Sequence, residues 1–177
     1  VLTVSATLAL LGDEGPRPDP EATLGLLAQQ ALWCGDHLSL GSSANNHLIA
    51  ELAAVVAIGL LYPTLRGGAA RAARAHRALE EQVLAQFHPD GVPAEQSFGY
   101  LPFVAELLLL AFTASERAGR SVAPAVRERL ASALEFARMI RLPGGGWPQV
   151  SDEDDGRVLL ASEAASRMDL VMNALAA

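Results

Sequence analysis

The chain has 177 residues, of which 51% are hydrophobic and 5% aromatic, and its formal net charge is −7 at pH 7. This length suits one domain with a hydrophobic core. The acidic balance argues against nucleic acid as a partner, because phosphate binding needs a concentrated basic surface. The single cysteine, Cys34, cannot form an internal disulfide, and nothing resembles a Cys/His zinc site. No apolar run approaches the roughly 20 residues of a membrane span, so we expect none.

Ala and Leu dominate the sequence and β-branched runs are few, which predicts an all-α fold. The apolar stretch 1–11 lacks the basic residues of a secretory signal, and we interpret it as a helix already under way in a longer protein. A Pro- and Gly-rich loop over 12–20 ends it. Further helices are then predicted in chain order over 21–39, from just after Ser43 to Tyr62, over 65–87, from just after Tyr100 to about 118, over 123–141 and, as a short last helix, over 162–175. We expect these helices to form antiparallel hairpins.

The helix that begins after Ser43 is apolar almost all round, which is typical of a helix inside a larger array. Either Ser42 or Ser43 can cap its start. The polar string Asn45-Asn46-His47 follows, where free backbone N–H groups favour a carboxylate ligand. The alternative is plain capping, with His47 pairing with Glu51 one turn along the helix.

The next helix carries Arg71, Arg74 and Arg77 on its polar side and ends at a turn sequence over 88–91. Glu95 and Gln96 come soon after, and Tyr100 stands where loop becomes helix, with Pro102 suited to the first turn. A phenol at such a place can reach a groove. Its alternative role is that of an ordinary half-buried Tyr that makes one hydrogen bond.

Trp147 lies among Gly and Pro residues and suits either a sugar-stacking platform or a packed loop anchor. The acidic run 152–155 does not fit a calcium loop, because Ser151 falls where the first Asp of an EF-hand is needed. We expect this run and Arg157 to be a solvated loop that braces its neighbours. No metal and no cofactor is expected.

These motifs, in their order along the chain, resemble those of the helical domain of heparinase II/III-like polysaccharide lyases. The resemblance covers about residues 32–157 and rests on 42–51, on Asp90-Gly91-Val92 with Glu95-Gln96-Ser97 and Tyr100, on Phe103-Val104 and on 152–157. It implies an (α/α) toroid, here a partial one, in which helical hairpins surround a groove for an anionic polysaccharide. We expect residues 1–177 to be a single helical domain or a fragment of one, without the β-sandwich that usually follows in the family.

The resemblance also implies the chemistry, which is β-elimination at a uronic acid. Asn46 would bind the substrate carboxylate and so favour removal of the C5 proton, and Tyr100 would donate a proton to the departing oxygen and also act as the base. His47 would bind the carboxylate or serve as the base. Asn45, Glu95, Gln96, Trp147 and Arg157 would support the site or bind substrate. Polymer substrates favour a periplasmic or extracellular location.

The sequence departs from the family in one respect. Members commonly complete the site with a further His or Tyr from later regions, and no other histidine here stands in a matching string. A partial toroid would also leave apolar surface for the rest of a parent chain or another copy to cover. Two other functions therefore stay open: a noncatalytic scaffold that binds anionic glycans, and a glycoside hydrolase that uses two carboxylates from Glu95, Asp154 and Asp155.

Overall fold

The computed structural model describes residues 19–62, 64–144, 147–151 and 158, which contain five helices and no strand. This confirms the all-α prediction. The helices expected over 1–11 and 162–175 lie outside the described residues. The five helices are α2 (Pro20–Asp36), α3 (Asn46–Leu61), α4 (Gly68–Gln86), α5 (Tyr100–Arg117) and α6 (Pro124–Met139).

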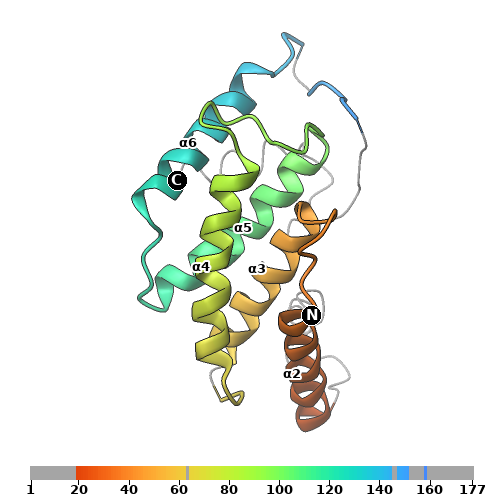
Figure 1. Cartoon of the computed structure of the whole chain (residues 1–177), viewed down its shortest axis with the longest axis vertical. Coiled ribbons are helices and arrows are strands. Elements are labelled where there is room, and N and C mark those ends of the chain that lie inside the picture. The colour runs from red at the N-terminus through yellow and green to blue at the C-terminus, as the bar shows by residue number, and fades with distance from the viewer. Residues whose placement is uncertain (1–18, 63, 145–146, 152–157, 159–177) are drawn as a thin grey trace.

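The central helix is α3, which packs against α2, α4 and α5, while α6 packs against α4 (Figure 1). Ten of the sixteen residues of α3 are buried, as its nearly uniform apolar sequence predicts. By contrast, Leu27 is the buried residue of α2. The core therefore lies around α3, with α2 at one edge of the molecule.

Glycines shape the contact between α3 and α4 and the start of α4, and Gly59 is the one at the contact. A Cβ atom at Gly59 would lie 2.5 Å from the carbonyl oxygen of Gly68 and 2.8 Å from the Cβ of Ala72. Gly67, which precedes α4, has a φ of 73° and so lies in the left-handed region. This conformation explains why α4 begins at Gly68 rather than at the predicted Leu65.

Polar side chains connect α4 to α5 and α6 inside the fold. The Nδ1 of buried His76 lies 2.9 Å from the Oγ of Ser115, which is fully buried. One turn further along α4, Glu80 accepts a hydrogen bond of 2.7 Å from the backbone N–H of Ala123, the residue that precedes α6. Arg129 of α6 donates to the carbonyls of Leu84 and Phe87 at the end of α4. A cation at that position complements the C-terminal end of a helix.

The connection between α2 and α3 differs from its prediction at both ends. α2 stops at Asp36 instead of Ser39, and the N–H and Oγ of Ser39 each donate a hydrogen bond of 2.7 Å to the carboxylate of Glu51. The cap of α3 is Asn45, so the prediction that Ser42 or Ser43 caps this helix is wrong. α4, α5 and α6 end within two residues of their predicted ends.

A ring of hairpins is not defined by these five helices, so the toroid stays a prediction. Among the helices in the described part of the chain, none combines the length and the hydrophobicity that a bilayer crossing needs.

Candidate functional site

The loop between α4 and α5 turns back on the end of α4. The backbone carbonyl of His88 accepts a hydrogen bond from the N–H of Gly91, and the backbone N–H of His88 donates to the carbonyl of Val92. These hydrogen bonds confirm the turn predicted over 88–91. Gly91 has a φ of 87°, and a Cβ there would lie 2.1 Å from the carbonyl oxygen of Ser132 in α6. The N–H of Ala94 then donates to the carbonyl of Gln86. This path brings the following residue, Glu95, beside the C-terminal end of α4.

Glu95 meets the first residues of α3 at this point. Its Oε1 accepts one hydrogen bond of 3.1 Å from the Nδ2 of Asn45 and another of 2.6 Å from the Nδ2 of Asn46. Asn46 is 6% exposed, so its amide is largely removed from solvent. Hydrogen bonds to a charged acceptor are stronger than neutral ones, and one carboxylate oxygen therefore fixes both amides.

Gln86, a residue that no sequence motif marks, also contacts the backbone at the start of α3. The Nε2 of Gln86, at the end of α4, lies 3.1 Å from the carbonyl oxygen of Asn45 and 3.4 Å from that of Ala44. It also donates to the Oε1 of Gln82. Nothing in the sequence around Gln86 distinguishes it from a solvated helix-end residue, because its role appears only when α3 and α4 are packed together.

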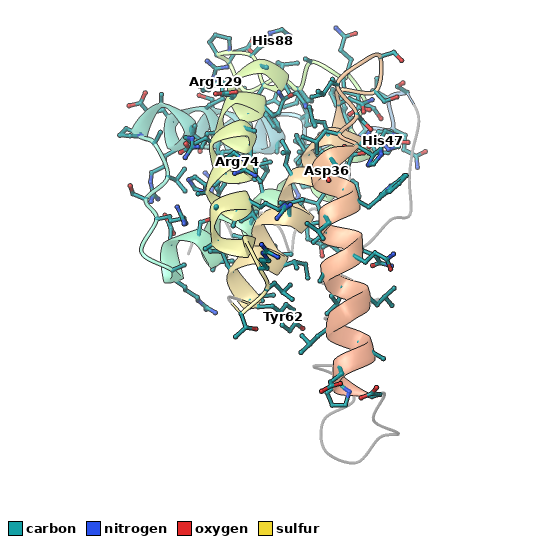
Figure 2. The ribbon with its side chains drawn as sticks, turned by 60° about the horizontal axis from the view of Figure 1, so that its bottom comes forward. Asp36, His47, Tyr62, Arg74, His88 and Arg129 are labelled. Atoms are coloured by element: carbon teal, nitrogen blue, oxygen red, sulfur yellow. The ribbon has the colours of Figure 1, made fainter. Side chains whose placement is uncertain are left out.

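The polar string at the start of α3 divides into residues with different roles. The Oδ1 of Asn45 accepts from the backbone N–H of His47, which is the capping predicted as the alternative role. Asn46 points its amide to Glu95 instead. His47 is exposed and lies at the end where α3 begins, away from Tyr62 at the other end of that helix (Figure 2). The pairing of His47 with Glu51, which belonged to the same alternative, is not formed, and the carboxylate of Glu51 accepts hydrogen bonds from Ser39 instead.

Tyr100 is the first residue of α5, and it is half-buried. Since α3 and α5 begin at the same end of the molecule, Tyr100 and Asn46 belong to the same end of the fold (Figure 1). Between Glu95 and Tyr100 the chain passes through exposed Gln96, which has a φ of 54°, and buried Ser97. A left-handed conformation is uncommon for a residue other than glycine, and it redirects the chain into α5.

Trp147 is half-buried and packs against the hydrophobic core. The guanidinium carbon of Arg141 lies 5.7 Å from its ring centroid, within the range of a cation–π contact. These contacts are those of a loop anchor, and sugar stacking by Trp147 stays a prediction. The same segment reaches the candidate site, because the N–H of Phe98 donates to the carbonyl of Val150. The acidic run 152–155 and Arg157 lie outside the described residues.

The candidate site therefore consists of the amides of Asn45 and Asn46 at the start of α3, the carboxylate of Glu95 in the loop between α4 and α5, and Gln86 at the end of α4. The family model described as Heparinase II/III N-terminus matches residues 20–168. The chain belongs to the heparinase II/III N-terminus family. This match confirms the resemblance found in the sequence and includes every residue of the candidate site. Neither the curated proteins nor the solved structures gave a match.

In this member of the heparinase II/III N-terminus family, the arrangement provides an oriented hydrogen-bond donor, the amide of Asn46. A primary amide has two N–H donors, and on Asn46 one of them is held by Glu95. An oriented donor of this kind can bind an anionic group with little reorganisation. In the described part of the chain, Glu95 thus orients the amides of Asn45 and Asn46 at the start of α3.

Proposed function

We propose that this chain is the helical part of a polysaccharide lyase that cleaves uronic-acid-containing glycans by β-elimination. The observation that carries the proposal is the fixed amide of Asn46, which is buried and held by Glu95 at the start of α3. Membership in the heparinase II/III N-terminus family supports it.

The proposed role of Asn46 follows from the difficulty of the reaction. Removing the C5 proton of a uronate places further negative charge beside an ionised carboxylate. The second N–H of Asn46 would donate to that carboxylate and stabilise the enolate-like state, which contributes on the order of 3 kcal/mol in a preorganised site. His47, exposed beside Asn46, would add a second contact to the carboxylate or accept the proton.

Tyr100 would carry the proton transfers. A phenol at the start of α5 can accept the C5 proton as phenolate or donate a proton to the glycosidic oxygen as the C4–O bond breaks. The products are a chain with a new reducing end and a sugar with a C4–C5 double bond. No redox partner is required, because the elimination is internally balanced.

The direct test is the ultraviolet absorbance of the new double bond during incubation with a panel of uronans that includes heparan sulfate and alginate. This chain and any longer natural protein that contains it are both assayed. We expect absorbance to rise with at least one polymer. Asn46→Ala should lower kcat by about 10²–10³-fold, and Tyr100→Phe by about 10²–10⁴-fold.

Tyr62→Phe is the matched control, because Tyr62 and Tyr100 are the two tyrosines of the chain and Tyr62 follows α3 at its other end. It should retain full activity. Turnover by the longer protein alone would mean that this chain supplies only part of the site. No double bond with any polymer in either form would overturn the proposal.

The noncatalytic scaffold that binds anionic glycans is the second candidate, and the family match favours it, because the matching model describes the N-terminus of the family alone. Glycan binding without turnover, equally strong in Tyr100→Phe, would support the scaffold. Saturated products would instead support the glycoside hydrolase.

A further inference from the structure

An apolar groove of about 610 Å³ lies between the second halves of α3 and α5. It is separate from the candidate site, which lies where these helices begin. Its walls are formed mainly by aliphatic side chains: Ala57, Leu60 and Leu61 from α3, and Leu109, Leu110 and Ala114 from α5. Leu61 is 57% exposed although it is the last residue of the central helix. Exposed apolar grooves are places where partner segments pack.

The chain itself returns to this groove. Glu106, one of the lining residues, is only 2% exposed, and its Oε2 accepts a hydrogen bond of 3.2 Å from the backbone N–H of Val158. The side chain of Val158 packs against the hydrophobic core. Val158, the residue that precedes the segment 159–177, therefore lies beside Glu106, the lining residue nearest to the start of α5.

The sequence of this segment suits an apolar groove. Small and apolar residues recur at helical spacing over 161–175, namely Ala161, Ala164, Ala165, Met168, Val171, Met172 and Leu175. The intervening positions include Glu163, Arg167, Asp169 and Asn173. Spacings of three and four residues place one group on one face of a helix and the other group on the opposite face.

We propose that residues 159–177 cover the groove between α3 and α5 as an amphipathic helix. The lengths agree: from Glu106 to Arg117 the α5 wall extends about 16 Å, and a helix over 162–175 is about 21 Å long at 1.5 Å per residue. Met168 and its apolar neighbours then meet Leu61, Leu109 and Leu110. The occupant is tethered at Val158, which gives it a high effective concentration over any free partner.

Limited trypsin digestion of the native chain tests this proposal, with mass spectrometry of the released peptide 168–177. The chain contains no lysine, and Arg167 is the one arginine between residues 159 and 177, so this peptide reports cleavage in the segment alone. The test variant is Leu61→Glu. The matched control is Leu26→Glu, because Leu26 is also a helix residue, is 45% exposed, and lies on α2 outside the groove.

We expect slow release of the peptide from the native chain and from Leu26→Glu, and release at least about tenfold faster from Leu61→Glu, because a carboxylate in the covered groove favours the open state. Circular dichroism should show that both variants keep the helices. Equal release from all three proteins would overturn the proposal. Protection that depends on protein concentration would also overturn it, in favour of a second copy as the occupant.

Discussion

Glu95 is the residue on which the amides of Asn45 and Asn46 meet. We predict that Glu95→Ala lowers kcat by about 10–100-fold, with a smaller change in KM, because the Asn46 amide loses its orientation. The substrate for this assay is the uronan that the native protein cleaves. Glu95→Gln should retain more activity, since its carbonyl oxygen can still accept from an amide. Steady-state kinetics of both variants check this.

Glu128→Ala is the control for this prediction, because Glu128 is exposed on α6, a helix that contributes no residue to the amide cluster. It should be indistinguishable from the native chain. If Glu95→Ala kept its kcat while Asn46→Ala lost it, Glu95 would have no part in positioning the amide. A fall of both kcat and the melting temperature that Glu95→Gln does not rescue would point to lost stability.

At the residue level, the sequence predicted the members of the site better than their contacts. Asn45, Asn46 and Glu95 were all singled out, but the hydrogen bonds between them span 49 and 50 residues. No local pattern encodes such a pairing, because it depends on how α3 and α4 pack and on the turn over 88–91. Gln86 was missed for the same reason.

At the level of elements, the contact between α3 and α4 depends on Gly59. We predict that Gly59→Ala destabilises the chain by about 1–3 kcal/mol, because its new methyl group would overlap the carbonyl of Gly68. Gly25→Ala is the control, since nothing lies within 4 Å of a Cβ at this position in α2. It should stabilise the chain by about 0.5–1 kcal/mol. Urea denaturation measures both, and a stabilising Gly59→Ala would contradict the close packing.

The predicted elements were correct where apolar periodicity and breakers agree, and wrong where side chains compete with the backbone. Pro63 and the 88–91 turn mark the ends of α3 and α4 in the sequence. The end of α2 and the start of α3 are decided instead by Ser39 binding Glu51 and by Asn45 capping. Capping residues such as Ser and Asn occur several times in this stretch, so the sequence alone does not select among them.

For the molecule as a whole, the uneven burial of the helices predicts that some of them unfold locally more readily than others. Hydrogen exchange of the native chain should be at least about tenfold slower in the middle of α3 than in α2, since α3 is surrounded by three helices whereas α2 packs chiefly against α3. Mass spectrometry of exchanged peptides from 20–36 and 46–61 makes the comparison. Equal protection of the two helices would contradict the central place of α3.

The overall class was predictable because hydrophobic periodicity and Ala/Leu content report helices directly. The spatial order of the helices was not, since each amphipathic or apolar helix could pack against several others. The family match adds the evolutionary relationship of the chain, and the closed toroid still depends on helices beyond the five described.

The contact between Gln86 and the backbone of Asn45 also has a consequence for folding order. A chain leaving the ribosome presents Asn45 and Asn46 well before Gln86 and Glu95. The two amides therefore cannot take their final orientation when α3 first forms, and must wait for α4 and the turn that follows it. During synthesis, the candidate site can be completed only after α4 and Glu95 have left the ribosome, because its hydrogen bonds join residues 41 to 50 positions apart.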